Sequence, residues 1–218
     1  VAHDLKNPLT SALSISGLLS SEKITEDQRE YLSMMKKSLN RMNRLVAKIL
    51  EIKVLDSTSF KINYSNVDLK QVTEQVISAF KIQSDNKKIR IVTDLDEVAA
   101  SLDRSLVVQI IDNLLSNAIK YSNHNTNVHV ALKDENRTIR FEIEDEGPGI
   151  KEDDIPYLFQ KFQKLHARPT DGESSTGLGL SIVKKYVEAM EGKVWCESEY
   201  GKGARFIVEF KKERNEKP

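Results

Sequence analysis

The sequence predicts two regions: a helical hairpin that forms a four-helix bundle in a dimer, followed by an α+β two-layer sandwich. Three observations support this division. Residues 1–55 carry only helical periodicity, strands and helices alternate after residue 56, and most of the strands fall in hairpins. Such hairpins with intervening helices favour a mixed, mostly antiparallel sheet covered on one face by helices. We therefore expect domains at residues 1–55 and 56–218.

The first region contains two helical segments separated by a short polar break. Thr25 and Gln28 fit a capping box that begins the second helix. In that helix, apolar residues recur at alternating steps of three and four, the pattern of a packed bundle. They are Leu32, Met35, Leu39, Met42, Val46 and Ile49. Two helices cannot cover both of their apolar faces, so we predict a homodimer.

The second region alternates strands with helices and ends in a hairpin around "YGKG". The expected strands are residues 60–67, 87–95, 127–134, 138–145, 193–199 and 203–210. The expected helices are residues 68–85, 103–122 and 176–192. Asp68 is placed to cap the first of these helices, and Gly192 ends the last one.

Composition excludes several classes of function. Lys plus Arg is 33 and Asp plus Glu is 33, so the net charge of +0 gives no global field to recruit nucleic acid. The single cysteine, Cys196, excludes an internal disulfide framework and fits a reducing, cytoplasmic compartment. No apolar run is long enough to span a bilayer. Because the chain begins with Val1 in the middle of a helical pattern, we expect an upstream sensor region outside this fragment, where any membrane anchor would lie.

Two glycine-rich stretches resist a purely structural interpretation. "DEGPGI" at residues 145–150 follows a strand, and its glycines let the backbone approach a flat ligand while the carboxylate accepts a hydrogen bond from an amine. "TGLGL" at residues 176–180 leads into a helix, whose free N–H groups and positive dipole end suit a phosphate. The first could equally be a tight turn, and the second is a weak match by itself.

A third candidate lies in the helix expected at residues 103–122. Asn113 and Asn117 are four residues apart, so they share one face of an otherwise apolar helix, next to Lys120. Amides in such a surface need partners, and nearby backbone groups could supply them. The alternative is a Mg²⁺ site in which an amide oxygen ligates the ion and Lys120 offsets phosphate charge.

Residues 151–175 form a long connection between the two glycine-rich stretches, with an apolar patch followed by a polar segment. Long connections in compact domains are uncommon unless they are functional, so we expect a mobile lid over the site. We call these residues the lid segment. His166, within it, is interpreted as a surface residue.

The opening stretch "VAHDLKNPLT" places His3 beside a carboxylate on a helix that contains Pro8. At about 100° per residue, His3 points away from the apolar positions of its helix. Its neighbours on that outward face are small and polar: Asn7, Thr10, Ser14 and Gly17. Another protein could approach such a face closely. A neutral imidazole there can act as a nucleophile while Asp4 accepts the N–H of its second nitrogen.

Along essentially its whole length, the chain resembles the transmitter core of a sensor histidine kinase. That core is a dimerisation and histidine-phosphotransfer hairpin followed by a catalytic ATP-binding domain of the Bergerat (GHKL) type. Five motifs stand in the family's order: "HDLKNPLT" as H box, "DNLLSNAIKYS" as N box, "DEGPGI" as first glycine box, "LFQKF" as F box and "TGLGL" as second glycine box. The chain departs from the family at Glu146, Gln160 and Ser175.

The resemblance implies ATP-dependent autophosphorylation of His3 and phosphotransfer to an aspartate of a response regulator receiver domain, with ATP and Mg²⁺ as cofactors. It also implies that Asp4 orients His3, that Asn7 positions water for phosphatase action on the regulator, and that Asn117 ligates Mg²⁺ with support from Asn113. The residues that it implies for ATP binding are Asn113, Asn117, Lys120, Tyr121, Asp145, Gly147, Gly149, Lys161, Lys164, Thr176, Gly177, Leu178, Gly179 and Leu180.

Two other interpretations stay open. The altered Gln160 and Ser175 allow a dimeric, nucleotide-responsive scaffold that binds ATP without transferring phosphate. A general GHKL ATPase of the chaperone or mismatch-repair kind shares the asparagine and glycine features. It gives no reason, however, for "HDLKNPLT" on a dimerising hairpin.

Overall fold

The structure, a computed structural model, describes residues 2–20, 24–55, 61–163, 165–171 and 176–212. In the first two helices, side chains are described for residues 8–20, 24–40, 42, 43 and 46. The chain divides into two compact units, Val1–Phe60 and Lys61–Pro218. The expected boundary at residue 55 adjoins residues 56–60, which lie outside the described residues, so it stays a prediction.

The first unit is the expected helical hairpin, in which α1 (Ala2–Leu19) packs against α2 (Glu26–Leu55). The capping box is confirmed, because the Gln28 N–H donates to Thr25 Oγ1 over 3.3 Å and the Thr25 N–H donates to Gln28 Oε1 over 3.0 Å. Leu39 is buried in the hairpin, but Met35 and Met42 remain 42% and 41% exposed. Part of the apolar seam is therefore uncovered in a single chain.

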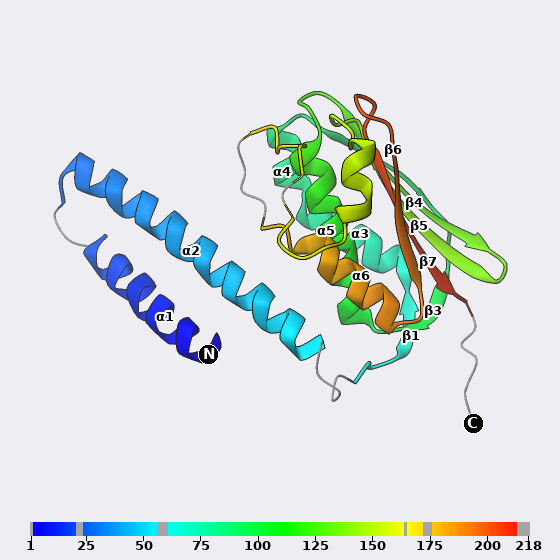
Figure 1. The fold of residues 1–218 in the computed structure, drawn as a ribbon, viewed down its shortest axis with the longest axis horizontal. Coiled ribbons are helices and arrows are strands. Elements are labelled where there is room, and N and C mark those ends of the chain that lie inside the picture. The colour runs from blue at the N-terminus through cyan, green and yellow to red at the C-terminus, as the bar shows by residue number, and fades with distance from the viewer. Residues whose placement is uncertain (1, 21–23, 56–60, 164, 172–175, 213–218) are drawn as a thin grey trace. The chain divides into compact units, whose positions relative to one another are not determined.

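The second unit is a two-layer sandwich, with α3 to α6 lying on one side of a five-stranded sheet (Figure 1). The strand order is β2-β4-β5-β7-β6. Its strands are β2 (Arg90–Leu95), β4 (Asn127–Glu135), β5 (Thr138–Asp145), β6 (Lys193–Ser198) and β7 (Ala204–Lys211). The pair β2 and β4 is parallel and the other pairs are antiparallel, so the prediction of a mixed, mostly antiparallel sheet is confirmed.

The helices on the sheet are α3 (Leu69–Ala79), α4 (Lys81–Asn86), α5 (Arg104–Tyr121) and α6 (Gly179–Ala189). Apolar residues of α3, α5 and α6 are buried, whereas α4 buries only Ser84. Asp68 caps α3 as expected, accepting the Gln71 N–H over 2.9 Å. The side chain of Asp103 does the same for α5, where it accepts the N–H groups of Ser105 and Leu106. Among the helices of the described ranges, none combines the length and apolarity that a membrane crossing needs.

Three details differ from the sequence prediction. The helix expected at residues 68–85 is two helices, because the backbone leaves helical geometry at Phe80, where ψ is 0°. The strand expected at 60–67 is reduced to β1 (Ser65–Asp68) in the described residues, and it pairs with an unpredicted strand, β3 (Ala99–Leu102), in a separate two-stranded sheet. The last helix begins at Gly179, so Thr176 to Leu178 precede it.

Candidate nucleotide-binding site

Asp145 ends β5 and lies opposite Ala204 of β7, in the interior of the second unit. Its residue surface is only 5% exposed, and its carboxylate accepts the Gly147 N–H over 2.9 Å. Burial raises the pKa of Asp145 to about 6, although hydrogen bonds from the Gly147 and Ala204 backbones oppose the shift. The site therefore holds a buried carboxyl group whose charge is costly and which can accept a hydrogen bond from a ligand.

The turn after Asp145 approaches neighbouring backbone too closely for side chains. A Cβ on Gly147 would lie 2.7 Å from the Tyr121 carbonyl oxygen and 2.7 Å from Asp145 Oδ1. A Cβ on Gly149 would lie 2.2 Å from the Glu199 carbonyl oxygen. The geometry thus brings Tyr121, at the carboxyl end of α5, next to the Asp145 carboxylate. We call residues 145–149 the floor of the site.

Asn113 and Asn117 both lie half-buried on α5. The Asn113 amide nitrogen donates to the Gln109 carbonyl over 2.8 Å, and Asn113 Oδ1 lies 3.0 Å from the position that a Cβ on Gly179 would take. Asn113 Oδ1 is therefore directed at the first turn of α6. The Asn117 side chain accepts or donates no hydrogen bond within the described part of the chain, so its amide can serve a ligand.

The second glycine stretch leads into α6 and places the amino end of that helix next to Asn113. The α6 N-cap residue, Leu178, provides no capping side chain and is itself fully buried, so it contributes its backbone to the site. Leu180, in the first turn of α6, is half-buried. The Thr176 hydroxyl accepts the Leu178 N–H over a long 3.4 Å. The first N–H groups of a helix lack helical partners, which makes this end a binding site for anions.

Gly177 fixes the second glycine stretch against the F box. Its φ is +67°, and a Cβ there would lie 2.6 Å from the Gln163 carbonyl oxygen. The Phe162 N–H donates to the Gly177 carbonyl over 2.8 Å. Residues 162–163 of the lid segment are therefore in direct backbone contact with the stretch that leads into the candidate phosphate-binding end of α6.

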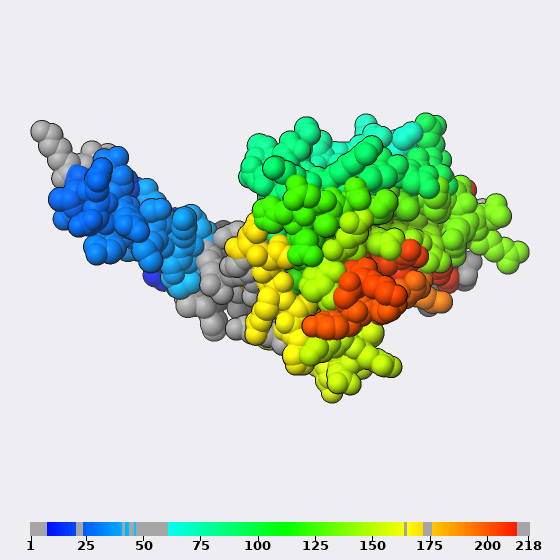
Figure 2. Space-filling model, turned by 90° about the horizontal axis from the view of Figure 1, so that it is seen from above, coloured from blue at the N-terminus to red at the C-terminus, as the bar shows by residue number. Residues whose placement is uncertain are grey.

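The lid segment contains a short 3₁₀ helix, η1 (Glu152–Tyr157), and most of its described residues reach the surface of the unit (yellow-green to yellow in Figure 2), whereas Asp154 and Leu158 are buried. Lys161 is exposed, whereas Lys164 lies outside the described residues. His166 is exposed, as predicted, and it also contacts Asp154: its N–H donates to Asp154 Oδ2 over 3.0 Å and its Nδ1 lies 2.9 Å from the same oxygen. These bonds lower the pKa of Asp154 and close the first half of the lid segment on itself.

His3, Asp4 and Asn7 lie in α1, but their side chains lie outside the described residues. Further along the same helix, Thr10, Ser14 and Gly17 are exposed, in agreement with the predicted outward face. A Cβ on Gly17 would meet nothing within 4 Å.

Several residues at the site were not identified from the sequence. Lys87, before β2, donates to the carbonyls of Ile119 and Lys120 at the end of α5. Ser198 Oγ donates to the Gly203 carbonyl over 2.6 Å and accepts the Ile150 N–H over 2.9 Å, which joins the floor to the β6–β7 turn. No spacing in the sequence indicated either residue. A buried lysine is rare, and the serine acts through backbone groups.

The divergent Glu146 has a structural use. Its carboxylate accepts the backbone N–H of Asn127 over 3.2 Å and the side-chain amide of Asn127 over 3.0 Å. These bonds lower the pKa of Glu146 and fasten the floor to the start of β4. The residue is therefore engaged with its own sheet.

Two family models match the chain. Residues 102–214 match the histidine kinase-, DNA gyrase B-, and HSP90-like ATPase family, which is just over half of the chain. Residues 1–58 match the His Kinase A (phospho-acceptor) domain. Between these matches lie residues 59–101, which include β1, α3, α4, β2 and most of β3.

Curated relatives and solved structures agree with these matches. Autoinducer 2 sensor kinase/phosphatase LuxQ of Vibrio cholerae is 29% identical over 100% of this chain and 26% of its own length. Sensor histidine kinase WalK of Bacillus subtilis is 29% identical over 99% of this chain and 36% of its own. The chain thus spans a quarter to about a third of these relatives.

The structure of full-length ShkA in complex with AMPPNP superimposes with a TM-score of 0.84 at 28% identity, covering 96% of this chain and 44% of that one. Histidine kinase AdeS of Acinetobacter baumannii gives 0.70 at 27% identity, covering 98% and 100%.

Proposed function

This chain belongs to the histidine kinase-, DNA gyrase B-, and HSP90-like ATPase family, and we propose from this premise that it is an ATP-dependent protein-histidine kinase. It phosphorylates His3 and passes the phosphoryl group to an aspartate of a response regulator. The observation that carries the proposal is the presence, in one chain, of a phospho-acceptor hairpin at residues 1–58 and an ATPase unit with a buried acidic floor.

The floor binds the adenine of ATP. Asp145 accepts a hydrogen bond from the exocyclic amine, while Gly147 and Gly149 keep the approach to the base clear of side chains and Tyr121 borders it. The ionised carboxylate is the stronger acceptor. The structure of ShkA, similar to this chain along 96% of its length, was solved with the ATP analogue AMPPNP, which supports a nucleotide here.

The triphosphate lies at the amino end of α6. Backbone N–H groups of residues 176–180, from Thr176 through Gly177, Leu178 and Gly179 to Leu180, face its negative charge. Lys120 neutralises part of that charge from α5, and Lys161 and Lys164 reach the γ-phosphate from the lid segment.

The residues of α5 fit Mg²⁺ bound together with ATP. In the described ranges, no cluster of His, Cys, Asp or Glu could hold a metal ion by itself. Mg²⁺ instead accepts one or two protein oxygens, keeps several waters and binds phosphates, a pattern that the unpaired amide of Asn117, with support from Asn113, can satisfy. When bound, the ion neutralises charge on the β- and γ-phosphates.

His3 receives the phosphoryl group. A neutral imidazole nitrogen attacks the γ-phosphorus, the bond from that phosphorus to the bridging oxygen breaks, and ADP leaves with the electron pair. Asp4 accepts the N–H of the other ring nitrogen and stabilises the cation that forms. A carboxylate of the regulator then attacks the same phosphorus, which returns His3 to its neutral form.

We assign residues 1–55 to the dimerising phosphotransfer hairpin and residues 56–218 to the catalytic domain. The partly uncovered Met35 and Met42 on the seam of α2 support a homodimer, because a second hairpin would cover them. Since ATP is the substrate, the kinase core works on the cytoplasmic side. The chain spans only part of its relatives, so the sensor region lies elsewhere in the full-length protein.

Asn7 gives the same hairpin a phosphatase activity. Its amide, four residues after His3, orients a water molecule against the aspartyl phosphate of the regulator. The small residues Thr10, Ser14 and Gly17, exposed along α1, let a receiver domain approach this helix face. The name of the LuxQ relative, a sensor kinase/phosphatase, supports this pairing of activities.

The test is incubation of the chain with Mg²⁺ and ATP labelled on the γ-phosphate. We expect a label that is lost in acid and stable in alkali, as phosphohistidine is, and no label in the His3→Gln variant. His129→Gln is the matched control, because His129 is exposed on β4, and it should be labelled like the wild type. Label that persists in His3→Gln would exclude His3 as the acceptor. ATP binding without any label would favour the scaffold.

A further inference from the structure

Lys87 is a buried lysine at the end of α4. Its side chain is 5% exposed, although lysine is almost never buried without partners because its charge loses hydration. The next residue, Lys88, is exposed, so only one of two adjacent lysines is buried. Its partners account for the burial.

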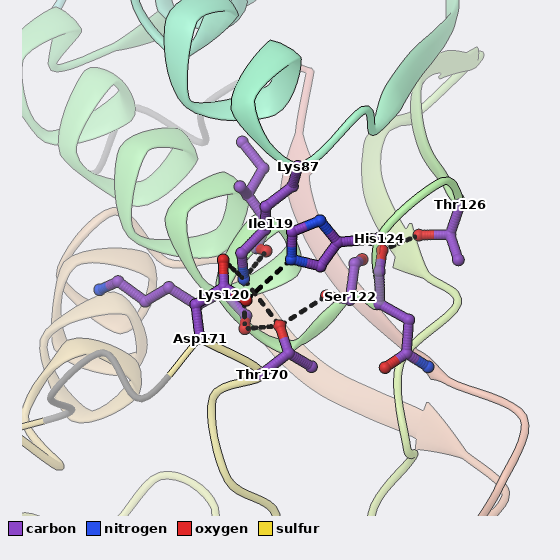
Figure 3. A network of polar contacts seen from close by, with 9 residues as sticks. Lys87, Ile119, Lys120, Ser122, His124, Thr126, Thr170 and Asp171 are labelled. Carbon is purple, nitrogen blue, oxygen red and sulfur yellow. Dashed lines mark hydrogen bonds and ion pairs between the residues drawn. The ribbon is translucent and has the colours of Figure 1, made fainter.

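The Lys87 ammonium closes the carboxyl end of α5. Its Nζ donates to the carbonyls of Ile119 and Lys120, both over 3.1 Å (Figure 3). The last carbonyls of a helix have no helical partner and carry the negative end of the helix dipole. A lysine charge at this position therefore holds the end of the helix that carries Lys120 and Tyr121.

The same ammonium holds the far end of the lid segment. Lys87 Nζ lies 2.7 Å from Thr170 Oγ1 and 3.8 Å from Asp171 Oδ2. Thr170 in turn donates its N–H to the Lys120 carbonyl over 3.1 Å and its hydroxyl to the Ser122 carbonyl over 2.9 Å. Asp171 Oδ1 also lies 2.8 Å from His124 Nε2. Figure 3 shows these groups converging on one point from α5, the lid segment and the loop before β4.

We propose that Lys87 is a positioning residue for nucleotide binding, which couples the lid segment to α5. The inference rests on the proposed ATP site. Lys87 joins α5, which supplies Asn117 and Lys120 to that site, to the lid segment, which supplies Lys161 and Lys164. The middle of the lid segment is tied to Gly177, just before α6, through the Phe162 N–H, and Lys87 ties Thr170, further along the segment, to α5. The lid segment is thereby held at two points beside the proposed phosphate site.

The experiment compares Lys87→Met with wild type in two measurements. Amide hydrogen exchange of the nucleotide-free chain reports the anchor itself. We expect the Thr170 amide to exchange at least tenfold faster, while the Phe162 amide, bonded to Gly177, stays unchanged. The Asn125 amide is an internal control, because it donates to the backbone carbonyl of Lys87 over 3.1 Å and not to its side chain.

Autophosphorylation kinetics report the consequence for the nucleotide. We expect the KM for ATP to rise about tenfold with kcat within twofold, because the anchor acts on binding. Lys81→Met is the matched control: Lys81 is an exposed lysine of α4 whose ion pair with Asp85 is on the surface, and both measurements should stay at wild-type values. Lys87→Arg, which keeps the charge, should restore part of the KM.

A uniform rise in exchange across the unit would show that Lys87 only stabilises the fold and would overturn the proposal. An unchanged KM with a faster Thr170 amide would overturn it as well. If Lys87→Met fails to fold, Thr170→Val provides a second test, because it removes only the hydroxyl that Lys87 contacts. For this variant we expect a threefold rise in the KM for ATP. Absence of ATP binding by the wild type would instead refute the proposed function, and the exchange of Thr170 would remain measurable.

Discussion

The floor and the lid segment face the same candidate site but are held by different contacts. The floor at residues 145–149 is held by close backbone approaches, with Gly147 and Gly149 leaving no room for a Cβ. The described part of the lid segment is held mainly through side chains, Asp154 with His166 and Thr170 with the buried Lys87. A backbone approach tolerates no added atom, whereas a side-chain bond can open and close. The difference favours rigidity in the part proposed to bind the base and adaptability in the part proposed to bind the phosphates.

The carboxyl groups of the two regions shift in opposite directions. Burial raises the pKa of Asp145 on the floor to about 6. Hydrogen bonds and ion pairs with His166 and His124 lower the pKa of Asp154 and Asp171 in the lid segment. As the pH falls from about 6 to 4, Asp145 therefore gains a proton while the carboxylates of Asp154 and Asp171 stay ionised.

The largest expected effect comes from adding one methyl group beneath the floor. Gly203 has φ +95°, and a Cβ there would lie 1.9 Å from the Asp145 carbonyl oxygen, so Gly203→Ala should lower the free energy of unfolding by about 4 kcal/mol. Gly201→Ala is the matched control, because Gly201 has φ +91° and nothing within 4 Å of its Cβ position. Gly201→Ala adds backbone strain without a steric clash, so its free energy of unfolding, measured with urea, should fall by about 1 kcal/mol. Equal losses would contradict the account of a sterically closed floor.

A smaller effect follows from the pKa of Asp145. Since its pKa is raised on folding, its ionisation costs stability, and the cost grows as pH rises from about 4 through 6. Asp145→Asn removes the charge, so the nucleotide-free variant should exceed wild type by about 2 kcal/mol at pH 7 and by little at pH 4. Urea unfolding at both pH values measures this. ATP affinity of the wild type should also fall below pH 6, when the carboxylate acceptor is lost.

The ionised form of Asp154, in contrast to that of Asp145, should stabilise the fold. Its lowered pKa means that its charge adds stability above the ordinary Asp range, and that this contribution is lost as pH falls through the folded-state pKa. At neutral pH, Asp154→Asn should therefore be less stable than wild type, whereas Asp145→Asn should be more stable than wild type. A difference of the same sign in both variants would refute the contrast between floor and lid segment.

The smallest expected effect is local to the lid segment. Asp154→Ala should speed exchange of the His166 amide about tenfold, because that amide donates to Asp154 Oδ2, and lower global stability no further than Asp154→Asn does. The exposed neighbour Asp153 gives the control variant Asp153→Ala, with unchanged exchange. A loss of global stability in Asp154→Ala well beyond that of Asp154→Asn would mean that the lid segment is as rigid as the floor.

Periodicity predicted most elements of the second unit because their patterns are local. The hairpins of β4 with β5 and of β6 with β7, the long apolar α5 and the caps at Thr25 and Asp68 all follow from residues within one element or its flanks. The gathering of floor residues was foreseen through motifs, since glycines beside a carboxylate and glycines before a helix have chemical uses that spacing reveals.

The features that were missed depend on contacts distant in sequence. β3 has four residues and pairs with β1 over a separation of more than thirty residues, which no local pattern indicates. Lys87 and Thr170 are 83 residues apart. His166 is exposed as predicted, but its hydrogen bond to Asp154, 12 residues earlier, was missed because the segment between them has no periodicity. Partners of this kind become visible only when the chain has folded.

The position of β7 also determines when the unit can acquire its shape during synthesis. This strand, the last one that the structure describes, lies between β5 and β6, with Thr138 opposite Lys211 and Asp145 opposite Ala204. A nascent chain made only up to residue 203 has all the described helices, but its sheet still lacks the strand that pairs with β5 beside Asp145. Until β7 emerges, such a chain exposes apolar surface that chaperones can bind.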